Sequence, residues 1–314
     1  AFSEFGFPKS HSAAFAVLAF QSAWLRHNYP AEYYTALLNN QPMGFYPPHV
    51  LVHDAQRRGV AVLPVDINRS RARCSVESGS VRVGLVYVRA LGLEAAEAVE
   101  AERARNGPFT SLGDFARRVR LRPEAMENLI RVGALDAFGH GRRELLWQLG
   151  LLHLDIPIHK QGKVVACQLV LPLATEQDMV PLPEMQPWEK MAADYTVLEM
   201  SPGYHPIGLL RPRLKAAKTL PPIVPIRRLA SMEDGADVRV AGLVVTRQQP
   251  GTAKGFVFLL LEDETGVANV IVKPGFYQAH RALVRAEPML LMRGKVQRRD
   301  GILNLVATAM MPLS

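Results

Sequence analysis

The chain has 314 residues, of which 48% are apolar, and its 37 Lys and Arg against 29 Asp and Glu give a net charge of +8. This composition excludes wholesale disorder and provides enough length for two or three domains. The basic excess favours an anionic partner, nucleic acid before a membrane surface, while a merely basic soluble protein is the alternative.

The cysteines and the apolar runs exclude further classes of protein. Cys74 and Cys167 lie far apart, with no Cys or His partners at ligand spacing. A disulfide framework and a structural zinc site are therefore not expected, and the protein belongs in a reducing compartment. No apolar run reaches about 18 residues, so we expect no transmembrane helix, no membrane partner and a cytoplasmic location. Because the chain starts at Ala1 without Met or a signal-like segment, we expect a fragment of a longer protein.

The first predicted helix follows Lys9-Ser10-His11-Ser12 and runs to about His27. Ser10 or Ser12 is a suitable N-cap, and apolar residues on both sides predict a helix buried inside a larger body. Lys9, Ser10 and His11 beside free N–H groups suit a triphosphate, and an ordinary cap with a solvated Lys is the alternative. Further helices are expected at Ala31–Asn39 and His49–Arg58, the second ended by Gly59, before a short extended Val60–Val65.

The polar segment Arg69–Gly79 is predicted to be a loop. Arg69, Arg71 and Arg73 alternate along it, so in an extended conformation they would share a face and could follow a nucleic-acid backbone. A solvated loop explains the same pattern equally well.

The stretch Val81–Arg105 predicts a helix-hairpin-helix unit: a strand to Gly84, a short helix to Arg89, a turn at Ala90-Leu91-Gly92 and a helix from Leu93. Amide groups of the hairpin and of the second helix start would then point outward together and bind a DNA phosphate. Gly92 supplies the turn conformation and lets a phosphate approach, while Leu91 fills the core. Ala90 departs from the usual pattern of Gly at both hairpin ends, and a plain αα-hairpin is the alternative.

A second, degenerate copy is expected after Asn106-Gly107-Pro108-Phe109. Ser111 caps a helix to Val119, Pro123 begins another, and Gly133 ends it. Two copies in tandem favour backbone binding that weakens with salt and has little sequence preference. The expected phosphate partners are Arg117, Arg118, Arg120 and Arg131, in addition to Ala90, Leu91 and Gly92.

After a short helix at Arg142–Leu152, the segment 153–187 loses periodicity and is predicted to be a linker with little fixed structure. Its sequence Gln177-Asp178-Met179-Val180-Pro181-Leu182 lacks the aromatic anchor of a clamp peptide. Direct binding to a sliding clamp is therefore not expected. Helices follow at Trp188–Met200 and Leu209–Ala216, and His205 between them has no expected metal or catalytic role.

From Asp237 the apolar period changes toward two, which predicts a five-stranded OB-fold barrel with a helix at Pro274–Arg285. Its face and loops would bind single-stranded nucleic acid weakly and mainly through charge, because aromatic platforms are few (Phe256, Phe258, Phe276 and Tyr277). A barrel that docks protein is the alternative. Glu262-Asp263-Glu264 is expected to be a solvated acidic turn. The candidate contacts are Arg247, Lys254, Phe256, Lys273, Arg293, Lys295, Arg298 and Arg299.

The order of these segments resembles a known family over nearly the whole chain. GFPKSHSAAFAVLAFQSAWLRHNYPAEYYTALLNN followed by VLVHDAQRRGVAVLPVDIN resembles the C-terminal part of the fingers of bacterial C-family replicative DNA polymerases, the DNA polymerase III alpha-subunit type. NNQPMGFYPPHVLVHDAQRRGV is more similar to the error-prone branch used in damage-induced mutagenesis. The resemblance implies a multidomain α+β protein in which Lys9, Ser10 and His11 contact a deoxynucleoside triphosphate and the tandem unit grips primer-template DNA.

The same resemblance implies chemistry that this chain does not supply. Family polymerases hold two metal ions on palm Asp carboxylates, and here Asp54, Asp66 and Asp114 are isolated. We therefore expect no catalytic or metal-binding residue in this chain, Mg²⁺ ligands upstream of it, an inactive fragment, and recruitment by an accessory mutagenesis protein. The predicted domains are 1–72 (fingers), 73–147 (tandem unit), 148–225 (linker and bridging helices) and 226–314 (OB fold). A protein-interaction module and a standalone repair protein are the other readings.

Overall fold

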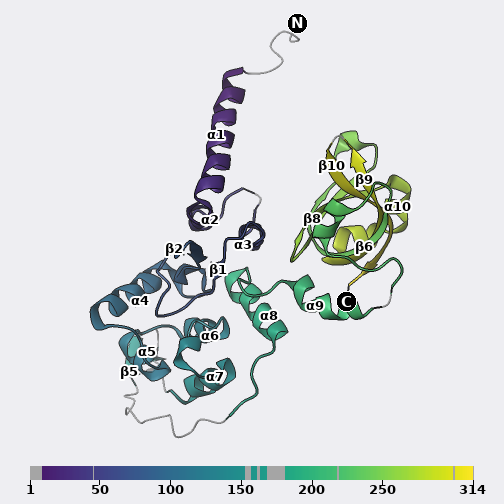
Figure 1. The fold of residues 1–314 in the computed structure, drawn as a ribbon. Helices are drawn as coiled ribbons and strands as arrows, with labels where there is room; N and C mark the ends of the chain where they lie inside the picture. The colour runs from purple at the N-terminus through teal and green to yellow at the C-terminus, as the bar shows by residue number, and fades with distance from the viewer. Residues whose placement is uncertain are drawn as a thin grey trace. The chain divides into compact units, whose positions relative to one another are not determined.

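The computed structural model describes residues 9–44, 46–152, 157–160, 163–167, 181–217, 219–299 and 301–313, with the side chains of Lys9, 157–160 and 163–167 outside that description (Figure 1). The chain divides into two compact units, Ala1–Gly203 and Tyr204–Ser314. The first unit is mainly helical, and the second is a barrel with short helices. The predicted OB domain, 226–314, falls within the second unit.

The first unit begins with α1 (Lys9–Asn28), α2 (Pro30–Asn39) and α3 (Pro48–Arg57). Pro30 and Pro48 stand in the first turns of their helices, where the missing N–H has no helical acceptor to lose. Gly59 then adopts a φ of +82° just after α3, in agreement with its predicted place at the helix end.

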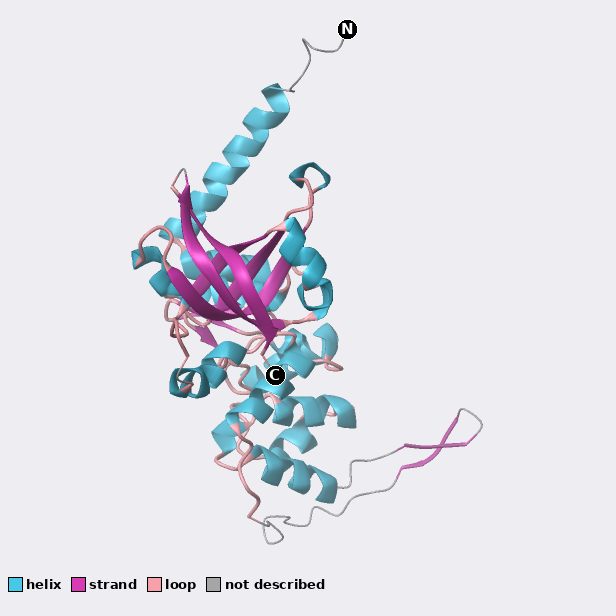
Figure 2. Ribbon diagram, turned by 90° about the vertical axis from the view of Figure 1, so that its right-hand side faces the viewer, coloured by secondary structure: helices cyan, strands magenta, loops and turns pink. Residues whose placement is uncertain are grey.

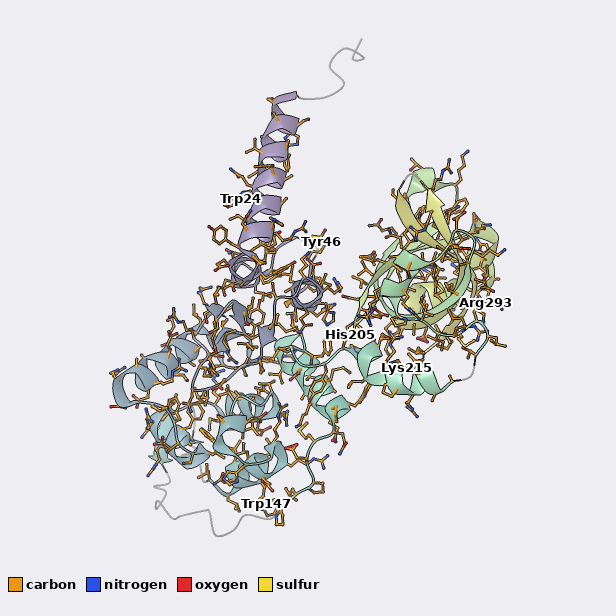
Figure 3. All side chains as sticks on the ribbon, in the orientation of Figure 1. Trp24, Tyr46, Trp147, His205, Lys215 and Arg293 are labelled. Atoms are coloured by element: carbon orange, nitrogen blue, oxygen red, sulfur yellow. The ribbon has the colours of Figure 1, made fainter. Side chains whose placement is uncertain are left out.

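Two expectations for α1 are wrong. The helix already includes Lys9, so Ser10 and Ser12 lie inside its first turn and neither is its N-cap. The helix is also not buried: Phe20 is 70% exposed, and Trp24, labelled in Figure 3, is 48% exposed. Burial of a helix that is apolar all round needs packing surfaces on several sides. In the described part of the chain, α1 packs mainly against α2.

A small sheet follows, with β1 (Val62–Leu63), β2 (Ser75–Glu77) and β3 (Ser80–Arg82) in the order β1-β3-β2. β1 is parallel and β2 antiparallel to β3. The segment 69–79 was expected to be a loop throughout, but it contains β2. Ser78 and Gly79 both have positive φ, +50° and +76°, as a tight two-residue hairpin turn requires, and this turn allows β2 to pair with β3.

The helical part of the first unit contains a 3₁₀ turn at Leu85–Tyr87 and another at Asp136–Phe138. Its α-helices are α4 (Gly92–Asn106), α5 (Leu112–Arg118), α6 (Pro123–Arg131), α7 (Arg142–Leu151) and α8 (Pro187–Leu198). Phe115, Leu129 and Leu145 are fully buried in one core that extends back to α2 and α3. Ser111 caps α5 as predicted, because its hydroxyl accepts a hydrogen bond from the Asp114 N–H at 3.1 Å.

The predicted linker is not structureless. Within this segment, the strands β4 (Pro157–Lys160) and β5 (Lys163–Cys167) form an antiparallel pair, drawn in magenta in Figure 2. The run Val164-Val165 has high strand propensity, and this short signal is hidden in a segment that lacks longer periodicity. Residues 177–180 of the candidate clamp peptide lie outside the described residues.

The second unit is a closed barrel in the order β10-β8-β7-β6-β9 (Figure 2). Its strands are β6 (Asp237–Gln248), β7 (Val257–Asp263), β8 (Gly266–Val272), β9 (Met289–Arg299) and β10 (Ile302–Pro312). β10 runs parallel to β8 and antiparallel to β9, which closes the barrel. Short 3₁₀ turns lie at Ile226–Ser231 and Gly251–Ala253. The predicted helix between the third and fourth strands is split into α10 (Pro274–Ala279) and α11 (Arg281–Ala286).

The barrel binds α9 (Pro206–Ala216) through the acidic turn between β7 and β8. Arg211 donates to Asp263 at 2.7 Å and to both carboxylate oxygens of Glu264 at 2.7 and 2.9 Å. Asp263 is fully buried and also accepts from the amides of Thr265 and Gly266. The expectation that this turn is solvated is therefore wrong. The sequence alone places no cation near it, because Arg211 is more than 50 residues away.

Removal of this guanidinium should destabilise the second unit. Burial pushes the pKa of Glu264 up, but the hydrogen bond and the charge of Arg211 outweigh burial and hold this pKa below its usual value of 4.5. A depressed folded-state pKa contributes stability above the unfolded pKa, and this contribution is lost as pH falls through the folded value. We expect Arg211→Gln to lower the free energy of unfolding by about 3 kcal/mol at neutral pH.

The measurement is denaturant unfolding of both proteins between pH 7 and pH 3. The difference between wild type and variant should narrow below pH 4.5, the usual value for Glu264. Arg213→Gln is the control, because Arg213 lies exposed on the same helix. An equal loss in that control, or a difference independent of pH, would contradict the assigned pairing.

Candidate nucleic-acid interface

The hairpin between the 3₁₀ turn and α4 adopts a left-handed conformation at two positions. Ala90 has a φ of +68° and Gly92 a φ of +75°. Leu91 between them is only 6% exposed and packs into the core, as the sequence predicts. Gly92 is exposed, and a Cβ built on it would meet no other atom within 4 Å. The hairpin therefore points its buried side chain inward and presents its backbone outward.

Neighbouring helices hold this hairpin in place. The Arg89 N–H donates to the Val197 carbonyl of α8 at 3.2 Å, and the buried Asn128 of α6 donates to the Arg89 carbonyl at 2.9 Å. The Leu91 N–H donates to the Val88 carbonyl at 3.1 Å. The bonds to Val197 and Asn128 come from segments far away in the sequence, so the hairpin is a rigid part of the unit and not a free loop.

The start of α4 is uncapped. No side chain accepts a hydrogen bond at its N-cap, whereas Ser111 caps α5 and the Glu144 carboxylate accepts from the Gly141 N–H at the start of α7. The first amide groups of a helix have no acceptor within the helix and attract anions. The N-terminus of α4 and the exposed Gly92 together offer a site that a phosphate can approach.

The predicted second copy is not equivalent to the first. Between α5 and α6, Val119 and Arg122 have extended conformations and form no left-handed hairpin. Gly133 after α6 has a φ of +78°, but a Cβ there would lie 2.1 Å from the Arg142 guanidinium. Arg142 donates to Asp136 at 3.0 Å and to the Arg131 carbonyl at 2.9 Å, so this ion pair covers the turn.

The predicted phosphate-binding arginines fall into two groups. Arg118 donates to Glu102 at 3.0 Å, to Asp114 at 3.1 Å and to the Gly107 carbonyl at 2.8 Å, and its guanidinium lies 4.3 Å from the centre of the Phe109 ring. These contacts make it a brace between α4 and α5. The exposed group contains Arg117, Arg120 and Arg131, of which Arg131 pairs with Glu127 at 2.9 Å.

The predicted nucleotide contacts lie at the beginning of α1. Ser10 and His11 are exposed there, and the His11 ring is 4.4 Å from the Phe15 ring. The side chain of Lys9 lies outside the described residues. The role of these three residues in binding a triphosphate remains a prediction.

In the barrel, two predicted contacts are braces. Arg247 donates to the carbonyls of Val284 and Glu287, and Arg298 donates to the Met232 and Ala230 carbonyls. Such bonds fix the guanidinium groups on the barrel itself. Lys254, Lys273, Lys295 and Arg299 are exposed. Arg293, labelled in Figure 3, pairs with Asp237.

The outer face of β7 and β8 contains the most accessible aromatic ring of the barrel among its described residues. Phe258 is 38% exposed, whereas Tyr277 is buried and Phe276 stacks on His280 at 4.1 Å. Phe258 pairs across the strands with Ile271, and Asn269 pairs with Asn304 of β10. Sequence reasoning named Phe258 as an aromatic platform, and Asn269, which is exposed on the neighbouring strand β8, was not among its candidates.

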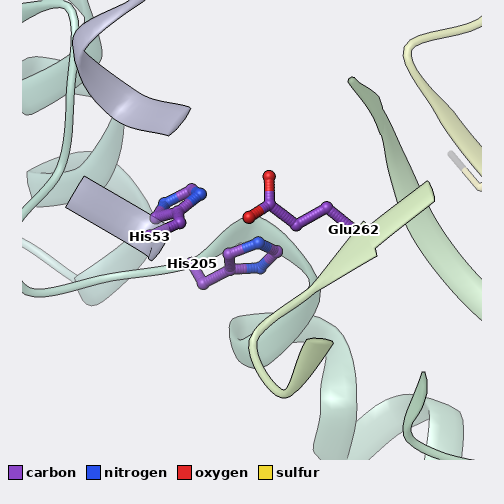
Figure 4. Close-up of side chains that lie close together, drawn as sticks. All are labelled: His53, His205 and Glu262. Carbon is purple, nitrogen blue, oxygen red and sulfur yellow. The ribbon is translucent and has the colours of Figure 1, made fainter. Parts of the chain in front are cut away.

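The second unit also brings together His205 and Glu262, which offer possible metal-ligand atoms within 4.8 Å of each other (Figure 4). The ring nitrogen Nδ1 of His205 accepts a hydrogen bond from the Ile207 N–H at 3.2 Å, which caps α9. Protein metal sites for zinc use three or four protein ligands. This pair alone therefore does not define a metal site, and His205 has a clear capping role.

Two family models match the chain. Residues 59–145 match a helix-hairpin-helix motif, and residues 238–313 match an OB-fold nucleic acid binding domain. Both matches agree with the predicted multidomain α+β architecture. No helix among the described residues has the length and apolar character that are needed to cross a membrane.

Curated relatives align over essentially the whole chain. An error-prone DNA polymerase of Corynebacterium glutamicum is 41% identical over 100% of this chain and 28% of its own length. That of Mycobacterium tuberculosis strain H37Rv is 44% identical over 99% of the chain and 27% of its length. That of Anaeromyxobacter sp. strain K is 39% identical over 100% of this chain and 27% of its own length. The chain thus spans little more than a quarter of these relatives and is homologous to their C-terminal part.

Among solved structures, asparaginyl-tRNA synthetase from Pyrococcus horikoshii is similar to part of this chain. The alignment covers 26% of this chain and 19% of the synthetase chain, with 25% sequence identity and a TM-score of 0.21. So limited a likeness supports no functional argument.

The left-handed conformation of Ala90 gives a prediction about stability. A side chain at positive φ costs about 1–2 kcal/mol, and Gly avoids this cost. Ala90→Gly should therefore raise the free energy of unfolding by about 1 kcal/mol. Ala98→Gly is the matched control, because Ala98 is exposed in the interior of α4, where Gly should lower stability by about 1 kcal/mol. Thermal unfolding measures both, and changes of the same sign would refute a strained Ala90.

Proposed function

We propose that this chain is the C-terminal, DNA-binding part of an error-prone DNA polymerase of the C family, which holds primer-template DNA for a polymerase that copies damaged templates. The homology to such polymerases over the whole chain supports the polymerase assignment. The open hairpin Ala90–Gly92 is the observation that supports DNA binding most directly.

The hairpin suits a phosphate and not a base. Its outward groups are backbone amides, and the exposed Gly92 leaves space for a tetrahedral anion to approach them. Contacts of this kind position the backbone of a duplex without reading its sequence. They also release counterions, so affinity should fall steeply as salt increases. Glu94 in the first turn of α4 opposes an anion, and binding at the hairpin alone is therefore weak.

The barrel would bind the single-stranded template. Phe258 offers one stacking surface on β7, with Lys254 and Lys273 exposed on the adjoining segments. One aromatic platform and a few cations predict weak and mainly ionic binding. Arg247 and Arg298 do not enter this proposal, because the barrel's own carbonyl groups already hold their guanidinium groups.

Nucleotidyl transfer would take place on residues outside this chain. The three aspartates that the sequence singles out, Asp54, Asp66 and Asp114, do not form a two-metal centre. Asp54 hydrogen-bonds to Tyr34 and Arg58, Asp66 accepts from the Asn68 N–H, and Asp114 pairs with Arg118. Each therefore has a structural partner. In the intact enzyme, Mg²⁺ would bind upstream carboxylates, a deoxynucleoside triphosphate would meet the Lys9–His11 region, and an accessory mutagenesis protein would recruit the polymerase.

A second function is that of a protein-interaction module with little contact to DNA. The braced guanidinium groups of Arg118, Arg247 and Arg298 favour it, because they remove three expected cations from the binding surface. The DNA-binding function predicts binding to DNA that weakens with salt, whereas the protein-interaction module predicts little binding to DNA at any salt concentration.

The hairpin assignment is tested by Gly92→Val. A branched side chain would block phosphate approach and oppose the φ of +75°, so affinity for a primer-template duplex should fall about tenfold, equivalent to about 1.4 kcal/mol. Fluorescence anisotropy at low salt measures the affinity. Gly107→Val is the matched control, because Gly107 has a φ of +80°, equally open surroundings and a place at the other end of α4. If both variants bind alike, or wild type binds no duplex, the hairpin assignment fails.

The barrel assignment is tested by Phe258→Ala. Loss of one base–aromatic stack should weaken binding to an oligothymidine by about 1–3 kcal/mol and leave duplex binding unchanged. Met311→Ala is the control, since Met311 is an exposed apolar residue at the far end of β10. Unchanged single-strand binding in Phe258→Ala would favour a barrel that docks protein.

A further inference from the structure

The segment before β2 exposes every second residue. Arg69, Arg71 and Arg73 are exposed, while Ser70, Ala72 and Cys74 between them are buried. All three arginines reach solvent, although the segment turns at 67–69 and bends at Ala72 and Arg73 and so is not a strand. Arg69 is bound by the Glu77 carboxylate. Neither the Arg71 nor the Arg73 side chain has a hydrogen bond or ion pair with the described part of the chain.

The backbone of this segment is fixed from both sides. The N–H of Leu85 donates to the Arg71 carbonyl at 3.0 Å, and that of Val86 donates to the Ala72 carbonyl at 2.9 Å. The Ala72 N–H donates to the Glu100 carboxylate at 2.7 Å. At its far end, Cys74 exchanges two hydrogen bonds with the Asn39 side chain, at 2.8 and 2.9 Å.

Gly84 lets its own segment lie directly against the backbone of Arg73. A Cβ on Gly84 would lie 2.4 Å from the backbone carbon of Arg73, so only glycine lets the two segments pack together. The arginines consequently project from a rigid support, which reduces the entropy lost when they bind a ligand.

A pocket of about 480 Å³ lies beside them. Its lining includes Arg71, Arg73 and Ser75 on one side and Glu97 and Glu100 of α4 on the other. Glu97 comes five residues after Gly92, which corresponds to about 7.5 Å along the axis of α4. The pocket therefore begins within about two helical turns of the open hairpin.

We propose that Arg71 and Arg73 form a second phosphate-binding edge that contacts the DNA backbone next to the phosphates held by the Ala90–Gly92 hairpin. The proposal rests on the proposed function and extends its binding site. Arg71 and Arg73 line the same pocket, so both can approach one bound backbone. Arginine binds phosphate oxygens through paired N–H groups.

The composition of the pocket favours a nucleic-acid backbone over a free nucleotide. No aromatic side chain lines it, so it offers no surface on which a base could stack. Glu97 is exposed at its rim and would repel a bound phosphate. The two arginines and this carboxylate should therefore have opposite effects on DNA affinity.

The test is a salt titration of duplex binding, with the double variant Arg71→Gln/Arg73→Gln in the full chain. Loss of two phosphate contacts should reduce the slope of log K against log salt by about 1.8 and lower affinity at low salt about tenfold. Glu97→Gln should raise affinity about twofold to fivefold. Arg69→Gln is the matched control, because the Glu77 carboxylate already binds Arg69 and its loss should change the slope little.

The outcomes separate this proposal from the proposed function. If wild type shows no salt-sensitive binding, the proposed function fails as well. If Gly92→Val weakens binding while the double variant keeps the wild-type slope, only the second edge is refuted. An Arg71→Lys/Arg73→Lys variant with near-normal slope would support a charge contact. If that variant and the glutamine variant both lose binding together with thermal stability, the arginines act structurally and the proposal is wrong.

Discussion

The amide groups at the start of α4, which no side chain caps, are the feature on which the proposed DNA-binding surface depends. They are accessible because Ala90 and Gly92 adopt left-handed conformations and Leu91 is buried between them. Ser111 caps α5 and Glu144 binds the N-cap amide of α7, while α2, α3 and α6 have no side-chain cap but begin with Pro, which has no N–H to offer. The backbone conformation of this short turn thus leaves the amides at the start of α4 open to an anion.

The arginines fall into two groups, those that the fold holds and those that a ligand can reach. A basic composition suggests many phosphate contacts, but burial and neighbouring carboxylates or carbonyls commit several arginines to the fold. Arg118 ties α4 to α5, Arg142 covers Gly133, and Arg211 attaches α9 to the barrel. Arginines of this kind add stability while they remove cations from solvent. Arg71 and Arg73 differ because their neighbours bind the Arg71 carbonyl and the Ala72 backbone, while both side chains are exposed.

The barrel shows the same division between structural and accessible groups. Its acidic turn looks like a solvated loop from the sequence, yet Asp263 is completely buried and organises the β7–β8 corner. Its outer sheet face is comparatively apolar around Phe258. A surface with one accessible aromatic ring and scattered lysines fits weak binding with little sequence preference better than sequence-specific binding.

The sequence by itself determined the order of elements, the five barrel strands and the position of the first hairpin, because periodicity, Pro and Gly are local signals. It did not determine which arginines are accessible, since Arg118 meets Glu102 and Arg298 meets the Ala230 carbonyl only after folding. It also missed β2, the β4–β5 pair and the burial of Asp263. Those features depend on contacts between distant residues, and only the tertiary structure brings these residues together.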